Sequence, residues 1–229
     1  MEEVVVKRNW TTKKSIYFII KRIIGFILAF IGLIIASPIM IIVAIAIKLD
    51  SKGPVIFKQP RTGKDGKVFN VWKFRSMYVD NDVHDFSKQD AHTKVGNFIR
   101  KTSLDELPQL FNILMGKMAF IGPRPWITDY YENMNYIQRH RCDVLPGITG
   151  LAQAKGRNNI TIFEKIGYDL EYIDNYSLLE DIKVIWWTIE TVLSKEGADA
   201  GKSVIENELN DLKTQEINID EIARASMKV

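Results

Sequence analysis

One uninterrupted apolar run near the N-terminus constrains this chain more than any other feature. Residues 23–47 contain no charged side chain over 25 positions. About 20 apolar residues in a helix are enough to cross the hydrocarbon core of a bilayer. The run is too long for the apolar core of a signal peptide, and no small-residue cleavage site follows it. The sequence therefore predicts a membrane helix here.

Basic residues flank this run on both sides. Those before it are Lys7, Arg8, Lys13, Lys14, Lys21 and Arg22, and those after it are Lys48, Lys52, Lys58 and Arg61. Because lysine and arginine accumulate on the cytoplasmic side of membrane segments, both ends of the helix are expected there. A straight spanning helix cannot satisfy this expectation, whereas a helix that enters the membrane, bends and returns can.

A Ser37-Pro38 pair lies near the middle of the run. Proline removes one backbone donor and displaces the carbonyl of Ile34, which kinks or breaks a helix. The Ser37 hydroxyl can satisfy that freed carbonyl, which matters in lipid. Proline kinks also occur in spanning helices, so the residues alone leave a re-entrant helix and a kinked spanning helix both open.

Charge is divided unevenly along the 229 residues. Residues 1–101 carry 18 basic and 8 acidic side chains, a net charge of +10, whereas residues 102–229 carry 13 basic and 20 acidic ones, a net charge of −7. A basic half beside an apolar run suits an anionic membrane face and anionic substrates. The single cysteine, Cys142, excludes an internal disulfide and a multi-cysteine metal site, and it favours a reducing compartment.

The rest of the chain predicts an α+β fold with a β-hairpin and several amphipathic helices. Residues 53–77 alternate on either side of a glycine-containing turn, which is typical of a hairpin. A polar surface loop is expected at 80–92 and a short strand or helix at 95–101. Periodicity and turn residues predict helices at 103–116, 126–142, 162–176 and 179–195, with rigid turns at 122–125 and 146–150.

These patterns divide the chain into three parts. We expect residues 1–52 to form a basic segment and the membrane helix, and residues 53–197 to form a cytoplasmic domain, the part in which a catalytic site is expected. Residues 198–229 are a polar, acidic appendage in which a helix is expected at 203–213.

Two adjacent carboxylates, Asp105 and Glu106, occur at the start of the helix predicted at 103–116. With Ser103 as the N-cap, Glu106 completes a capping box, which is a purely structural role. The chemical alternative is that Asp105 attacks phosphorus, since carboxylates form acyl phosphates. Glu106 would then hold a magnesium ion against a diphosphate. The pattern alone allows either role.

Several cations occur before and after the two carboxylates along the chain. They are Lys73, Arg75, Arg100, Lys101 and Arg124. Each alone is typical of a solvated surface charge, but together and beside a membrane helix they favour a site for a phosphate-bearing substrate. His84, His92 and His140 are too scattered to predict a transition-metal site.

Three longer segments carry a family resemblance. They read SPIMIIVAIAIKLDSKGPVIFKQPRTGKDGKVFNVWKFRSM, RKTSLDELPQLFNILMGKMAFIGPRP and PGITGLAQAKGRNNITIFEKIGYDLEYIDNYSLLEDIKVI. In content and order they resemble the bacterial sugar transferase family, the monotopic phosphoglycosyl transferases that start glycan assembly on undecaprenyl phosphate. The resemblance covers roughly residues 13–195.

This resemblance implies a mechanism and a location. Asp105 would be a nucleophile that forms a phosphosugar–aspartyl intermediate and releases UMP, and Glu106 would be a Mg²⁺ ligand. The substrates would be a UDP-sugar and undecaprenyl phosphate, used in turn. The membrane helix would be a re-entrant hairpin broken at Ser37-Pro38, in contact with membrane lipids. The catalytic domain would lie on the cytoplasmic face of the bacterial inner membrane.

The resemblance also implies substrate-binding residues. The positions that match the family pattern are Lys73, Arg100, Arg124, Arg157, Asp169 and Tyr172, and Arg75 joins them as the cation that ends the hairpin. The product would enter exopolysaccharide, capsule, O-antigen or glycoprotein glycan assembly as its first membrane step.

Two other classes of protein are alternatives to this interpretation. A polytopic sugar-1-phosphate transferase needs many spanning helices, and this chain has one apolar run. A non-enzymatic, membrane-anchored basic protein that binds anionic lipids or nucleic acid would use the carboxylates only as helix caps. We expect an enzyme without a nucleic-acid partner. The sugar, the downstream glycan and a homodimeric state are left open by the sequence.

Overall fold

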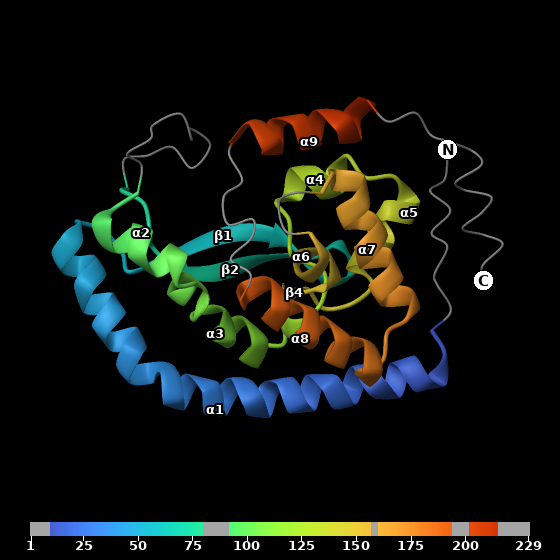
Figure 1. Cartoon of the computed structure of the whole chain (residues 1–229), viewed down its shortest axis with the longest axis horizontal. Coiled ribbons are helices and arrows are strands. Elements are labelled where there is room, and N and C mark those ends of the chain that lie inside the picture. The colour runs from blue at the N-terminus through green and yellow to red at the C-terminus, as the bar shows by residue number, and fades with distance from the viewer. Residues whose placement is uncertain (1–9, 80–91, 157–159, 194–201, 215–229) are drawn as a thin grey trace.

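The computed structural model describes residues 10–79, 92–156, 160–193 and 202–214. One long helix, α1 (Thr12–Asp50), runs along one side of a mixed α/β body (Figure 1). Two small two-stranded sheets and the shorter helices fill the space on its concave side. The α+β class predicted from the sequence is therefore confirmed for the described residues.

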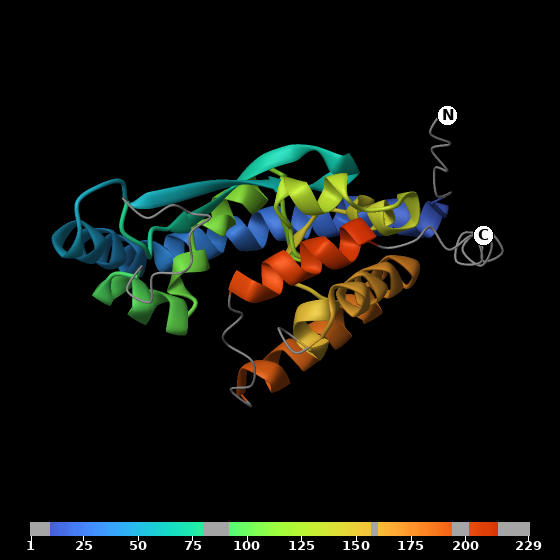
Figure 2. The same cartoon turned by 90° about the horizontal axis from the view of Figure 1, so that it is seen from above.

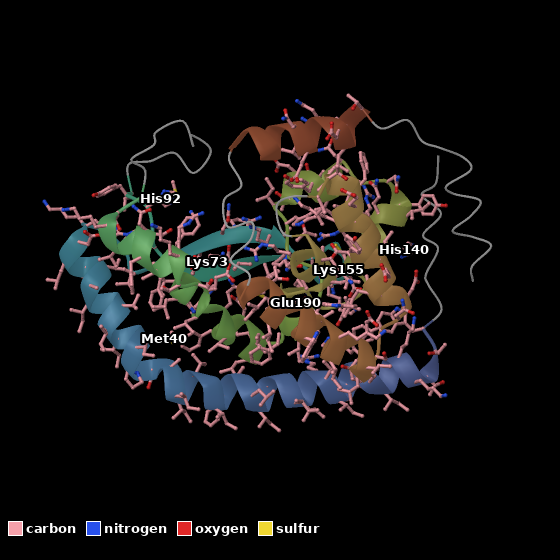
Figure 3. All side chains as sticks on the ribbon, viewed as in Figure 1. Met40, Lys73, His92, His140, Lys155 and Glu190 are labelled. Atoms are coloured by element: carbon pink, nitrogen blue, oxygen red, sulfur yellow. The ribbon has the colours of Figure 1, made fainter. Side chains whose placement is uncertain are left out.

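Helix α1 is continuous through Pro38 and bends in its second half (Figure 1). The Ser37 hydroxyl donates to the carbonyl oxygen of Ile34 at 2.8 Å, which is the rescue expected from the sequence. Met40, which follows the bend, is labelled in Figure 3. The predicted membrane segment is thus one bent helix.

Most large apolar side chains of α1 are exposed at the surface of the protein. Its buried positions are Gly25, Ala29, Val43 and Ile47, which face the body. Large residues such as Ile23, Ile27, Ile34, Ile35 and Ile42 are about half exposed or more. Within the described residues α1 alone is long and apolar enough to cross a membrane. An apolar helix face this large is typical of membrane association.

The predicted hairpin is present. Strand β1 (Ile56–Thr62) pairs antiparallel with β2 (Val68–Phe74), and a 3-10 turn, η1 (Lys64–Gly66), connects them. The buried amide of Asn112 fixes this hairpin to the body, because it accepts from Trp72 N at 2.9 Å and donates to Asn70 O at 2.7 Å. The hairpin is thereby held against the helix that carries Asn112.

The helix predicted at 103–116 is broken. It follows α2 (Lys94–Lys101) and divides into a 3-10 turn, η2 (Leu104–Glu106), and α3 (Gln109–Leu114). Pro108 has no N–H to donate to the carbonyl of Leu104, so the α-helical ladder restarts after it. Ser103 adopts a left-handed φ of 55° and makes no side-chain cap. The capping-box prediction is therefore wrong.

The segment 116–156 contains a parallel strand pair that the sequence did not predict. Strand β3 (Ala119–Ile121) pairs with β4 (Gly147–Thr149), and α6 (Leu151–Lys155) follows. A Cβ on Gly147 would lie 2.2 Å from the backbone nitrogen of Gly122. The turns at 122–125 and 146–150 therefore pack backbone against backbone. Glycine is required at Gly147 because nothing larger fits between the two turns.

Short helices replace the predicted helix at 126–142. They are α4 (Thr128–Glu132), α5 (Tyr136–Arg139) and a 3-10 turn, η3 (His140–Cys142). Asn135 begins α5 in a capping box with Gln138, and this interrupts the longer helix.

The C-terminal helices agree with their predictions. Helix α7 (Ile162–Asp174) begins at a Thr161–Glu164 capping box and is followed by α8 (Leu178–Leu193) and α9 (Lys202–Thr214). Helix α9 lies on the side of the molecule away from α1 (Figures 1 and 2), with Leu212 buried and Glu208 paired with Lys165 of α7.

Candidate active site

The two carboxylates lie where three segments meet: η2, the C-terminal end of β2, and the turn at 122–125. Lys73 Nζ lies 2.6 Å from Glu106 Oε1, and Arg124 Nη2 lies 3.2 Å from the same oxygen. Figure 3 shows Lys73 near the centre of the molecule, on the concave side of α1. Residues that are 18 and 33 positions from Glu106 in sequence therefore share one of its oxygens.

Glu106 is held ionised by these cations. Burial of the carboxylate opposes its charge, but Arg124 and Lys73 offset burial and lower the pKa of Glu106 to about 2. Burial also lowers the pKa of Lys73, and Glu106 counteracts that change. At neutral pH the group is an anion with two cationic partners.

Asp105 has a different environment. Its carboxylate is half-buried and forms no hydrogen bond or ion pair with any residue that the structure describes. Burial raises the pKa of Asp105, Lys73 lowers it in part, and the adjacent Glu106 raises it further. Asp105 is therefore a half-buried carboxylate beside several cations, without a fixed partner among the described residues.

Glu106 is the candidate ligand for a magnesium ion. Lys73 and Arg124 donate hydrogen bonds to its Oε1, and neither donates one to Oε2. The described residues hold no group of three or more acidic, histidine or cysteine side chains around one point. Mg²⁺ commonly uses one or two carboxylates together with substrate phosphates and water. Glu106 Oε2 fits this pattern as a single protein ligand.

Arg100 belongs to the same neighbourhood. It lies in the last turn of α2, and its charge lowers the pKa of Asp105 against the larger effect of burial. Its Nη1 lies 2.6 Å from His92 Nε2. Figure 3 shows His92 and His140 far apart, and His84 lies outside the described residues.

Arg75 does not join this site. Its buried guanidinium donates to the carbonyl and hydroxyl of Ser51, at 2.8 Å each, and to the carbonyl of Lys52. These bonds fasten the C-terminal end of α1 to the hairpin. Arg75 is therefore left out of the proposed substrate site.

Asp169 and Tyr172 are buried in contacts of their own. Asp169 Oδ2 accepts from Arg141 Nη2 at 2.6 Å, and both side chains are 2% exposed. Tyr172 donates to Asp181 at 2.6 Å and lies against Lys21 of α1. Both side chains thus have protein partners in this structure, and their role in substrate binding stays a prediction. Arg157 lies outside the described residues.

Sequence reasoning missed Arg61 as a neighbour of this site. Arg61 of β1 bonds the neutral amide of Gln59 at 2.6 Å, and burial together with the nearby charge of Arg124 lowers its pKa to about 10. It was counted only among the basic flanks of the membrane helix. The strand alternation that puts it on the same hairpin face as Lys73 was the signal available.

The fold and this site define a membrane-associated protein with a paired carboxylate site among cations. The chain belongs to the bacterial sugar transferase family, whose model matches residues 16–195. That match includes most of α1, the hairpin, the carboxylates and α8.

Several curated relatives are similar to this chain. A UDP-glucose:undecaprenyl-phosphate glucose-1-phosphate transferase of Klebsiella pneumoniae is 47% identical over 76% of this chain and 40% of its own length. An undecaprenyl-phosphate galactose phosphotransferase of Salmonella typhimurium is 38% identical over 83% of this chain and 44% of its own length. The chain thus spans less than half of these relatives. It covers 90% of the uncharacterized sugar transferase EpsL of Bacillus subtilis, at 40% identity.

Proposed function

We propose that this protein is a phosphoglycosyl transferase that moves a sugar-1-phosphate from a UDP-sugar to undecaprenyl phosphate. The observation that carries the proposal is the unequal pair of carboxylates. Glu106 is neutralised by Lys73 and Arg124, while the adjacent Asp105 has no partner among the described residues. The names of the Klebsiella and Salmonella relatives support this substrate class.

Asp105 is the nucleophile in the proposed reaction. One of its oxygens attacks the sugar-proximal phosphorus of the UDP-sugar, a P–O bond to the nucleotide breaks, and UMP leaves. An oxygen of the polyprenyl phosphate then attacks the same phosphorus, the acyl–phosphate bond breaks, and the Asp105 carboxylate is restored. Arg124 and Arg100 stabilise the charge that develops on the phosphate oxygens and on UMP.

Glu106 has a separate role in this scheme. Its Oε1 holds the two cations in place, and its Oε2 is available to ligate Mg²⁺ together with a phosphate oxygen. Magnesium would offset the negative charge between the substrate diphosphate and Asp105. The fold keeps Glu106 ionised at neutral pH for this purpose.

We infer that α1 enters and leaves the membrane on the cytoplasmic face. Both of its ends are fastened to the same body: Lys14 Nζ donates to the carbonyl of Asp174 at 2.7 Å, and Arg75 donates to Ser51. A spanning orientation would require this one body to lie on both sides of the bilayer. The bend after Ser37, with its satisfied Ile34 carbonyl, is compatible with a re-entrant path.

Helix α8 extends the lipid-facing surface in this proposal. Its N-terminal part contacts α1 through Asp181, which pairs with Lys21 at 2.7 Å. An exposed apolar stripe runs along α8 at helical spacing and consists of Leu178, Leu179, Ile182, Ile185, Trp186 and Ile189. Such a stripe suits the membrane interface, where the polyprenyl phosphate headgroup lies.

Trapping the covalent intermediate tests the function. The purified protein receives a UDP-sugar labelled in the sugar and Mg²⁺, but no lipid acceptor. We expect about one UMP per active site and a label on Asp105 that hydroxylamine removes, as for an acyl phosphate. The matched control is Asp65, an exposed carboxylate in the hairpin turn, changed to asparagine.

Three outcomes are informative. A label on Asp105 that polyprenyl phosphate discharges supports the full scheme. UMP release that requires polyprenyl phosphate, without trapped protein, would replace the two-step route by direct displacement. Absence of UMP release from a panel of UDP-sugars with undecaprenyl phosphate would favour the non-enzymatic lipid-binding alternative, and the same panel identifies the sugar.

A further inference from the structure

A buried ion pair behind the active site calls for an explanation. Arg141 of η3 and Asp169 of α7 are each 2% exposed, with Nε–Oδ2 and Nη2–Oδ2 distances of 2.9 and 2.6 Å. Burying two charges has a desolvation penalty of several kcal/mol per ion, and apolar residues of similar volume often stabilise a fold as well. A role beyond stability is therefore worth seeking.

Two further contacts of Arg141 are made to the turn that carries Arg124. Its Nη2 also donates to the carbonyl oxygen of Arg124 at 2.9 Å. Its guanidinium stacks on the indole of Trp126, with 3.6 Å between the guanidinium carbon and the ring centroid. Arg141 thus contacts the residues on both sides of Pro125, while Asp169 orients its guanidinium from behind.

The same turn is held by backbone bonds from two strands. Thr62 N donates to Trp126 O at 2.9 Å, and Gly147 N donates to Pro123 O at 3.0 Å. Arg141 supplies the bond at the centre of the turn, to the carbonyl of Arg124 itself. The backbone at and around Arg124 is therefore held by hydrogen bonds to β1, β4 and η3.

The Arg124 side chain needs such support. It is 46% exposed and reaches Glu106 through one bond of 3.2 Å. An exposed arginine loses rotamer freedom when it is held in one geometry, and an active-site cation must be held closely to act on a phosphate. A rigid backbone limits the orientations that the side chain can sample, and Arg141 and Asp169 provide it.

We propose that Arg141 and Asp169 are positioning residues that aim Arg124 at the phosphate bound beside Asp105 and Glu106. Neither touches substrate; they act through the carbonyl of Arg124 and the ring of Trp126. This assigns a role to Asp169, which the family resemblance placed among the substrate-binding residues. The inference rests on the proposed function.

A double-mutant cycle on UMP release tests it. Asp169→Asn keeps the side-chain shape but removes the charge that orients Arg141. We expect it to lower kcat/KM for the UDP-sugar about tenfold when Arg124 is present, and less than about twofold when Arg124 is replaced by alanine. An equal loss in both backgrounds would overturn the proposal, because the pair would then act on the fold alone.

The matched control is the other ion pair of α7. Lys165→Met removes the cationic partner of Glu208 and leaves its hydrogen bond from Tyr130, and both side chains of the ion pair are also largely buried. It is expected to lower the melting temperature while leaving kcat/KM unchanged in both backgrounds. A loss of kcat/KM in this control as large as that of Asp169→Asn would also overturn the proposal.

A second variant guards against failure of Asp169→Asn to fold. Arg141→Lys retains a cation for Asp169 but cannot also reach the Arg124 carbonyl and stack on Trp126 in the same way. We expect Arg141→Lys to lower kcat/KM when Arg124 is present, and to lower it less when Arg124 is replaced by alanine. If wild type itself releases no UMP, the proposed function fails; if wild type is active and both cycles are additive, the positioning role alone fails.

Discussion

Lys73 Nζ lies 2.6 Å from Glu106 Oε1, and this ion pair joins the end of the hairpin to the short turn that carries Asp105. Arg124 reaches the same oxygen from a third segment. Glu106 is thereby a structural junction as well as a candidate metal ligand. The adjacent Asp105 takes no part in the junction, so the two carboxylates should respond differently to substitution.

Asp105→Asn should abolish turnover without destabilising the protein. Its carboxylate has no partner among the described residues, and burial already disfavours its charge. We expect UMP release to fall about a thousandfold or more, with a melting temperature near that of wild type. Retention of a tenth of the wild-type rate would contradict the nucleophile assignment.

Glu106→Gln should lower both activity and stability. The amide cannot neutralise Lys73 and Arg124, which leaves Lys73 partly buried without a counter-charge. Because Arg124 is nearly half exposed, solvent screens the contribution of its ion pair with Glu106 to stability. We therefore expect a loss of about 1 kcal/mol in the free energy of unfolding. Thermal unfolding in detergent micelles measures it. Unchanged stability would mean that the junction has no energetic role.

The stability gap between wild type and Glu106→Gln should depend on pH in a defined direction. The pKa of Glu106 is lowered to about 2 in the folded protein, below the ordinary value of 4.5. Its contribution is therefore fully present above about pH 4.5 and is lost as the pH falls toward 2. Melting temperatures from pH 3 to 7 check this. A gap that widens as the pH falls would contradict the sign.

Cysteine labelling should place both ends of α1 on one side of the membrane. Lys13 and Lys52 are exposed at the two ends, and Lys67 in the hairpin turn marks the side of the body. Cys142 is buried and burial raises its thiol pKa to about 11, so the native background should stay unreactive. An impermeant reagent should leave all three substituted sites unlabelled in intact cells and label them in inverted vesicles.

Labelling of Lys13→Cys or Lys52→Cys, but not Lys67→Cys, in intact cells would show a spanning helix. Replacing both Ser37 and Pro38 with alanine should straighten α1 and shift the labelling toward that outcome. The single change Ser37→Ala, which keeps the proline and removes only the hydroxyl bond to Ile34, is the control.

Removing one partner of the Lys21–Asp181 pair should loosen α1 from the body. Asp181 also accepts from Tyr17 and Tyr172, so this carboxylate connects α1, α7 and α8. Asp181→Ala leaves the buried ammonium of Lys21 without a counter-charge and should lower the free energy of unfolding by about 3 kcal/mol or more. The double variant with Lys21→Met should recover part of that loss. A double variant less stable than Asp181→Ala would contradict this account.

The sequence by itself determined the features that depend on neighbours along the chain. The apolar run, the serine that satisfies the carbonyl displaced by Pro38, the hairpin at 53–77 and the helices from 162 onward all follow from local periodicity and turn residues. Local propensity also located the carboxylate pair. It failed at Ser103, because Pro108 and the tertiary packing of η2 override a capping signal.

The tertiary structure decided which distant residues share a site. Lys73 and Arg124 meet at Glu106, whereas Arg75, Asp169 and Tyr172, which carry equally suitable side chains, are taken up by Ser51, Arg141 and Asp181. These partners lie up to 33 residues apart, and the parallel pairing of β3 with β4 is equally remote in sequence. No local pattern encodes such contacts, because they depend on which surfaces the whole chain buries when it folds.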